Sequence, residues 1–190
     1  MSVVKEMTSR PLKWQPYISP VKLETATTEQ LDAMKITPSN KKVSDYVLTL
    51  AHDPESLAVR SPLFNAIMYG KEDLSPAERE LGAVAASIVN HCVYCISVHA
   101  ARYLRLTKRN DVIDAVFAGG EHPKLDEHSQ AIFDFSAALA RTPSAVTAEQ
   151  IAALRDLGLS EGEIVDLVLA SSIFGWANRL MHTLCEPVDP

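Results

Sequence analysis

The chain has 190 residues, of which 47% are hydrophobic and 22% are charged. This length and composition are typical of one globular domain with its own core and exclude a disordered segment. A net charge of −6 without a basic stripe argues against a nucleic acid partner. Abundant alanine and leucine beside only seven glycines favour helices over a turn-rich β architecture.

The beginning of the chain, MSVVKEMTSRPLKWQPY, has no apolar run long enough for a signal peptide. No stretch approaches the roughly 18 uninterrupted apolar residues of a membrane span. We therefore expect a cytoplasmic protein that does not contact a membrane. In such a reducing compartment, two cysteines separated by two residues are more often catalytic or metal-binding than a structural disulfide.

Residues 1–27 are predicted to form an N-terminal arm that packs on the body or on a neighbouring subunit. Prolines interrupt this segment, yet Trp14, Tyr17 and Leu23 are larger apolar groups than a free tail usually carries. Residues 28–190 are predicted to form one helical domain, because their apolar residues recur with the period of an α-helix.

Caps and apolar spacing predict the helices of this domain. The first three cover 28–34, the segment of Val43, Val47 and Leu50, and a stretch after Pro54 that Pro62 breaks or restarts before Gly70. The next three cover 76–89 behind a Ser75 capping box, Cys92 to Leu106, and a segment that is capped by Thr107 and ends at Gly119-Gly120. The last three are 126–140, a short helix after Thr147, and a final helix from Ile164 to Leu184 that Ser160 opens. Asn90-His91 is the expected turn, because asparagine tolerates the left-handed conformation. No β-type alternation competes, so the prediction is a single all-α bundle.

The residues that carry chemistry lie at the start of the helix predicted after this turn. With Cys92 at the helix start, Cys95 lies about 60° and His99 about 20° to one side of it, so the three share a face. A helix N-terminus stabilises a thiolate, and an imidazole can take the thiol proton. Two cysteines at this spacing can close and reopen a disulfide, which allows two-electron chemistry.

Glu80 joins this set only if the chain reverses at Asn90-His91. On one continuous helix Glu80 would lie roughly 18 Å from Cys92 and could not act on it. If the two helices pack side by side, Glu80 faces His99 at mid-helix, where a partly desolvated carboxylate suits proton transfer. Glu78, by contrast, is explained by the capping box.

The spacing E-x11-C-x2-C-x3-H, formed by Glu80, Cys92, Cys95 and His99, resembles the signature of the alkylhydroperoxidase D branch of the carboxymuconolactone decarboxylase-like proteins. The chain length, the proline-rich arm and the late Asn178-Arg179 resemble the peroxidase-related subgroup. The specific motif covers about 20 residues, and the looser resemblance covers most of the chain.

The resemblance implies an all-helical fold completed by homo-oligomerisation, as a trimer or hexamer, and reduction of a small hydroperoxide without metal, flavin or haem. Cys95 would attack the peroxide, and Cys92 would donate a proton and then resolve the sulfenic acid as a disulfide. His99 and Glu80 would relay protons, and a dithiol protein would restore the thiols. Position 94 departs from the pattern, since some members have histidine where this chain has Tyr94, a poor proton relay. His91 is a possible substitute, but it lies on a different face.

Other interpretations remain open at this stage. The helix terminus favours Cys92 as the stronger thiolate, whereas adjacency to His99 favours Cys95, which agrees with the resemblance. His182 and Cys185 could join the two cysteines in a zinc site of a helical binding module. A general thiol-disulfide oxidoreductase, or a cofactor-free decarboxylase or isomerase, would use the same fold. The remaining singled-out residues are interpreted structurally: His52, His122 and His128 as solvated, Ile173, Phe174 and Trp176 as core or interface, and Asn178 and Arg179 as capping or pairing groups.

Overall fold

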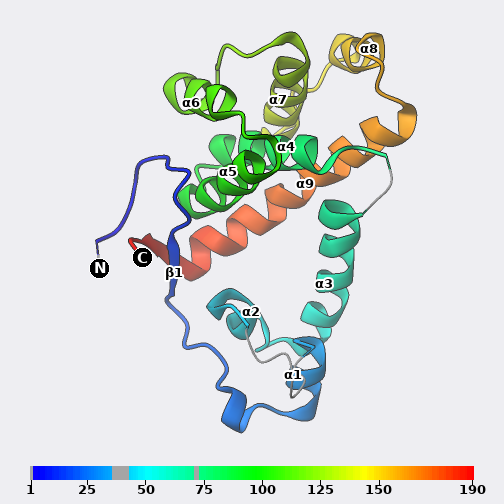
Figure 1. Cartoon of the computed structure of the whole chain (residues 1–190). Helices are drawn as coiled ribbons and strands as arrows, with labels where there is room; N and C mark the ends of the chain where they lie inside the picture. Colours follow the sequence, from blue (N-terminus) through cyan, green and yellow to red (C-terminus); the bar gives the residue numbers. More distant parts are fainter. Residues whose placement is uncertain (1, 36–42, 71–72) are drawn as a thin grey trace.

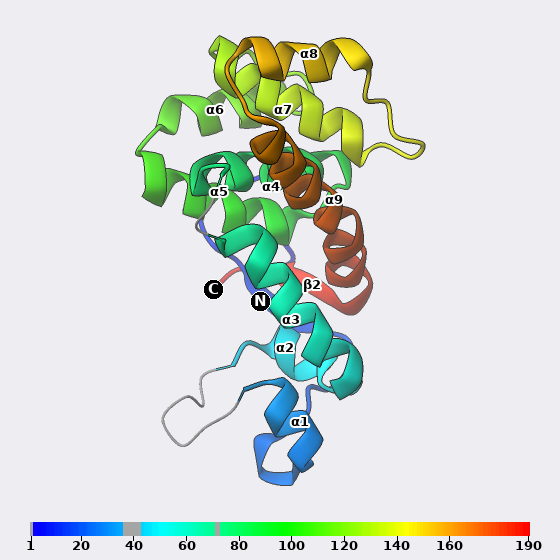
Figure 2. The same ribbon diagram turned by 90° about the vertical axis from the view of Figure 1, so that its right-hand side faces the viewer.

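The computed structural model describes residues 2–35, 43–70 and 73–190, so Met1 of the predicted arm lies outside the described residues. The elements are β1 (Lys13–Pro16), a 3₁₀ turn η1 (Leu23–Thr25), α1 (Thr28–Ala33), α2 (Asp45–Leu50), α3 (Pro54–Tyr69), α4 (Pro76–Val89), α5 (Val93–Thr107), α6 (Asn110–Gly119), α7 (Glu127–Ala140), α8 (Ala148–Asp156), α9 (Glu161–Leu184) and β2 (Cys185–Val188). The helices α4, α5 and α9 lie in the middle, with α6 to α8 on one side and α1 to α3 on the other (Figures 1 and 2). The prediction of a single, mainly helical domain is confirmed.

The two short strands correct the expectation that no β structure occurs. β1 and β2 pair in antiparallel register, with Lys13 opposite Val188 and Pro16 opposite Cys185. The arm also contacts α5, where the backbone N–H of Leu12 donates to Ser97 Oγ at 3.2 Å. Each strand has only four residues, which is too few for alternation to stand out in the sequence.

Helix α3 is continuous through Pro62, where a break or restart was predicted. Proline removes one backbone donor and leaves the carbonyl of Ala58, four residues earlier, without its helical partner. Both Pro62 and Ala58 are exposed, so solvent can satisfy that carbonyl and the helix continues.

Helix α4 is the centre of the core. Its predicted capping box is present, because Ser75 Oγ accepts from Glu78 N–H while the Glu78 carboxylate accepts from Ser75 N–H. Residues 79–88 are all buried, and α4 contacts α5, α7 and α9. Gly82 permits this close packing, since a Cβ there would lie 3.0 Å from Ser136 Oγ on α7 and 3.1 Å from Ser171 Oγ on α9.

Two helix boundaries differ in detail from the prediction. The left-handed residue after α4 is His91, with φ of 55°, whereas Asn90 has φ of −85°. Thr107 is the last residue of α5 and the residue that precedes α6 is Arg109. Thr107 Oγ1 accepts from Arg109 N–H at 3.1 Å, so its hydroxyl orders the connection instead of capping the next helix.

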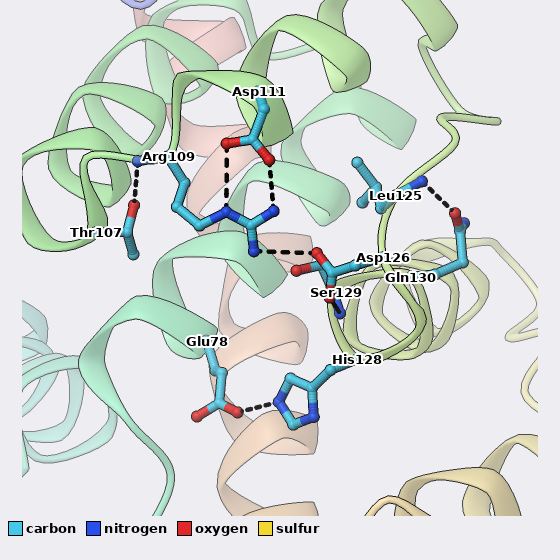
Figure 3. A network of polar contacts seen from close by, with 9 residues as sticks. All are labelled: Glu78, Thr107, Arg109, Asp111, Leu125, Asp126, His128, Ser129 and Gln130. Atoms are coloured by element: carbon cyan, nitrogen blue, oxygen red, sulfur yellow. Dashed lines mark hydrogen bonds and ion pairs between the residues drawn. The ribbon is translucent and has the colours of Figure 1, made fainter.

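Polar contacts tie α6 and α7 to the start of α4 (Figure 3). Arg109 forms ion pairs with Asp111 at 2.5 Å and with Asp126 at 3.1 Å. His128 Nε2 lies 2.6 Å from Glu78 Oε1, so this histidine has a carboxylate partner as well as solvent. These contacts fix the outer helices at the N-terminal end of α4.

Helix α9 has the length and apolar composition of a membrane-spanning helix, although no span was expected from the sequence. It packs against α4 and α7, and its buried side includes Leu167, Ala170 and Phe174. An apolar stripe packed against neighbouring helices is the arrangement of a core helix.

Asn178 joins α9 to the end of α4 and gives a test of this packing. Its side chain donates to Ser87 Oγ at 3.1 Å and accepts from Asn90 Nδ2 at 3.0 Å. Asn178 is fully buried, so Asn178→Ala should lower the free energy of unfolding by about 1–3 kcal/mol by leaving these groups unpaired. Urea unfolding measures this change, with exposed Asn110→Ala as the control. Equal stability of the two variants would contradict the role of Asn178.

Candidate active site

The turn between α4 and α5 places the two halves of the predicted motif together. After α4 ends, the backbone N–H of Cys92 donates to the carbonyl of Ser87 at 2.9 Å, and Cys92 becomes the N-cap of α5. The two helices then run back along each other, as the contacts between them show. The reversal that the argument for Glu80 required is therefore present.

Cys92 and Cys95 lie within disulfide distance, with 5.3 Å between their Cα atoms. Both side chains are buried. The sulfur of Cys92 accepts from the backbone N–H of Cys95 at 3.4 Å, so it occupies the position of a capping oxygen at the positive end of α5. In the reduced protein this end stabilises a thiolate on Cys92.

Glu80 and His99 form a buried pair across the α4–α5 contact. Glu80 Oε2 lies 2.5 Å from His99 Nδ1, and the two side chains are only 5% and 7% exposed. Arg102 Nη1 lies 3.9 Å from the other carboxylate oxygen. The ring of Phe174 packs edge-on against the imidazole, with 4.6 Å between the centroids. With Nδ1 held by a carboxylate, Nε2 of His99 is the nitrogen available for proton transfer.

A cavity of about 330 Å³ brings Cys95 and His99 to a common space. Its walls come from α5, α9 and the α2–α3 segment. They are lined by Ser44, Tyr46, Arg60, Phe64, Asn65, Tyr69, Tyr94, Cys95, Val98, His99, Arg102, Phe174, Ala177 and Met181. This volume is at the lower end of the roughly 300–1,000 Å³ of small-molecule sites. The cavity thus presents one thiol and one imidazole to a small ligand with apolar surface.

Tyr94 occupies the position at which some members of the resembling family have histidine. Burial raises the pKa of its phenol, and nearby Cys185 adds to this rise. The hydroxyl therefore stays protonated near neutral pH, so it can donate a hydrogen bond into the cavity but cannot act as a base. His91 lies outside this cavity and does not replace it.

A second, smaller hollow of about 60 Å³ lies on the other side of Cys92 and includes Cys185 and His182. His182 Nε2 is 2.6 Å from the carbonyl oxygen of Asn90. Burial and Glu186 raise the pKa of Cys185 to about 12. Within residues 2–35, 43–70 and 73–190, no group of three or more acidic, histidine or cysteine side chains is arranged to hold a metal ion. The zinc alternative therefore has no support from the geometry.

Several cavity residues were not singled out in the sequence. Arg102 follows Cys95 by seven residues, so helical spacing could have placed it on the same face. Tyr46 and Arg60 precede Glu80, the first residue of the motif, by 34 and 20 residues, and no local pattern connects them to it. Phe174 was expected in the core, and it is buried there while also contacting His99.

Comparison with known proteins gives a family match over part of the chain and a shared fold over most of it. Residues 54–133 match the carboxymuconolactone decarboxylase family, a range that contains all four motif residues. No curated protein shows significant sequence similarity to the chain.

Solved structures with the same fold cover nearly the whole chain. The alkylhydroperoxidase AhpD core of a peroxidase-related protein from Ralstonia eutropha JMP134 is 24% identical, with a TM-score of 0.77 over 92% of this chain and 93% of that one. The debrominase Bmp8 is 17% identical, with a TM-score of 0.70 over 91% and 92%. A cysteine-to-alanine variant of that debrominase has been solved with 2,3,4-tribromopyrrole. A peroxidase-related protein from Silicibacter sp. TM1040 is 23% identical, with a TM-score of 0.65 over 98% and 95%.

The raised pKa of Cys185 predicts that this thiol is inert in the folded protein. Because the thiolate is the reactive form, alkylation of Cys185 at about pH 8 should be far slower than that of an ordinary thiol, whose pKa is about 8.5. Its rate should rise only as the pH approaches 12. Iodoacetamide labelling followed by mass spectrometry measures this rate, and the urea-unfolded chain is the control. Equal labelling of Cys185 in the folded and unfolded chains would contradict the burial of this thiol.

Proposed function

We propose that the chain is a thiol-dependent peroxidase, and the premise is that its residues 54–133 match the carboxymuconolactone decarboxylase family. The observation that carries the proposal is the joint placement of Cys95 and His99 in one small cavity, with Cys92 in disulfide reach behind them. The fold shared with alkylhydroperoxidase-like structures supports it.

The first half of the proposed cycle oxidises Cys95. His99 Nε2 takes the proton of the Cys95 thiol, and the Glu80 carboxylate stabilises the resulting imidazolium. The thiolate attacks the terminal oxygen of the hydroperoxide, the O–O bond breaks, and the alkoxide takes a proton from the Cys92 thiol and leaves as an alcohol. Cys95 is then a sulfenic acid and Cys92 a thiolate, which the N–H of Cys95 and the helix terminus stabilise.

The second half closes the disulfide. The Cys92 thiolate attacks the sulfur of the sulfenic acid, and hydroxide leaves with the proton held by His99 as water. One hydroperoxide and two thiols thus give one alcohol, one water and one disulfide. A dithiol protein then reduces the disulfide by thiol exchange, so we place the enzyme in a reducing compartment, in keeping with the cytoplasmic expectation.

Reductive dehalogenation is a second candidate, because a protein of the same fold is a debrominase that binds a bromopyrrole in a variant lacking one cysteine. The same two thiols could convert a carbon–bromine bond into a carbon–hydrogen bond, with release of bromide and formation of the same disulfide. Both reactions consume two thiols and end at one oxidised pair. Product analysis with each substrate class therefore separates them.

We further propose that the chain assembles as a homo-oligomer. Large apolar side chains are exposed on α3 and α9, namely Val59, Leu63, Val165, Leu169 and Trp176. Burial of such groups between copies would remove apolar surface from water. Sedimentation of the full chain measures the assembly, and a monomer at all concentrations would reject this proposal.

Replacement of the nucleophile tests the peroxidase proposal directly. Cys95→Ser should abolish turnover of cumene hydroperoxide in the presence of a dithiol, because serine cannot form the sulfenic acid. Cys92→Ser should still consume about one equivalent of peroxide per chain but should not close the disulfide. Cys185→Ser is the control and should turn over as the unmodified chain does.

The opposite outcomes identify the alternatives. Unchanged peroxide consumption by Cys95→Ser would reject the assignment of the nucleophile. No turnover by the unmodified chain, together with a reversible Cys92–Cys95 disulfide, would favour a thiol-disulfide oxidoreductase that does not use peroxide.

Replacement of the acid that holds His99 tests the proton relay. Glu80→Gln should lower kcat/KM for hydroperoxide by about a hundredfold or more, since a neutral amide cannot stabilise the imidazolium. The pH profile of kcat/KM should also shift, which loss of packing alone would not produce. Glu78→Gln is the matched control on the same helix, because glutamine also completes a capping box. An equal loss in both variants would reject a specific role for Glu80.

A further inference from the structure

The cavity that is lined by Cys95 and His99 also contains a positively charged side chain that forms no ion pair with the described residues. The guanidinium carbon of Arg60 on α3 lies 4.5 Å from the ring centroid of Phe64 and 5.3 Å from that of Tyr46. No carboxylate of the described residues forms an ion pair with Arg60. The aromatic faces hold the guanidinium in place by cation–π attraction, but they leave its charge without a counter-ion.

The other cationic side chain of the cavity is already engaged. Arg102 lies 3.9 Å from Glu80 and donates to the hydroxyl of Tyr69. The described residues that line the cavity include these two arginines but no aspartate or glutamate. A ligand in this cavity would therefore lie near the positive charge of Arg60, which no carboxylate of the cavity lining neutralises.

Hydrogen bonding at the same wall is also incomplete. Arg60 Nε and Tyr46 Oη are buried, and neither has a hydrogen-bond partner among the described residues. Burial raises the pKa of Tyr46, and the neighbouring Arg60 guanidinium offsets only part of this rise, so the hydroxyl remains a donor near neutral pH. Buried donors without acceptors are costly. Two neighbouring donors of this kind, one of them charged, match the oxygens of one anionic group.

From this geometry we infer that the substrate carries a carboxylate, which binds Arg60 and the hydroxyl of Tyr46. This binding directs the rest of the substrate, an apolar group or a single ring, toward Cys95. The inference rests on the proposed function for the identity of the reacting group, but the binding of the carboxylate does not depend on the reaction. A planar carboxylate suits the forked donors of arginine. The aromatic side chains of Phe64, Tyr69 and Phe174 suit the apolar body.

Binding of an unreactive pair of ligands tests the inference without turnover. The full chain should bind 4-isopropylbenzoate about tenfold or more tightly than 4-isopropylbenzamide, as measured by calorimetry at neutral pH. Arg60→Gln should bring this ratio close to one, whereas Arg60→Lys should keep part of it. Arg105→Gln is the matched control, because it removes one charge from an exposed position on α5 and should retain the ratio.

Turnover of a matched pair of hydroperoxides extends the test to the reaction. The two substrates are cumene hydroperoxide and the same compound with a carboxylate in the para position. The value of kcat/KM for the carboxylate, divided by that for cumene hydroperoxide, should exceed about ten in the unmodified chain and fall toward one in Arg60→Gln. The ratio cancels any loss of activity that both substrates share.

The outcomes separate this inference from the proposed function. Equal binding of the acid and the amide by the unmodified chain would overturn the inference whether or not the variants fold. A ratio that Arg60→Gln and Arg105→Gln reduce equally would also overturn it. A carboxylate preference that requires Arg60, with no turnover of either hydroperoxide, would support the anion site and reject the peroxidase.

Discussion

The antiparallel contact between α4 and α5 brings the candidate catalytic residues together. Glu80 and His99 are nineteen residues apart and meet only because the chain reverses over three residues, with His91 in the left-handed conformation. Burying a carboxylate beside an imidazole is costly unless the two groups pair closely. The pair is therefore stable only while α7 and α9 hold α4 against α5, and the close approach at Gly82 is part of that constraint.

In the proposed cycle, the same reversal gives the two cysteines different roles. Helix-end electrostatics favour a thiolate on Cys92, while adjacency to His99 favours one on Cys95, and the sequence alone left these arguments opposed. In the structure the two residues open toward different spaces, Cys95 toward the larger cavity with His99 and Cys92 toward the hollow beside Cys185. A nucleophile must reach the substrate, whereas a resolving thiolate needs only to reach its neighbour. In the proposed cycle, the two stabilising effects therefore act at different steps.

Much of this arrangement could be predicted from local signals. Ser75, Thr147 and Ser160 mark helix starts because each side chain satisfies a backbone donor that the helix leaves free. The period of the helix places Cys92, Cys95 and His99 on one face. The β1–β2 pair and the continuity of α3 through Pro62 could not be predicted, since they depend on contacts between distant segments and on exposure to solvent. The wall formed by Tyr46 and Arg60 depends on tertiary packing in the same way.

Chemistry and specificity therefore have different structural origins in this fold. The thiols, the imidazole and its carboxylate all come from the α4–α5 hairpin, within the range that matches the family. The opposite wall comes from α2, α3 and α9; Tyr46 on α2 lies outside that range, whereas Arg60 on α3 lies within it. In the proposed cycle the hairpin ends as a disulfide and can act on any small molecule with a bond that two thiols can reduce. Under the proposed anion site, the opposite wall then decides which molecule reaches Cys95, with the aromatic rings selecting for shape and Arg60 for charge. Changes on α3 can thus alter the substrate while the distance between Glu80 and His99 stays the same.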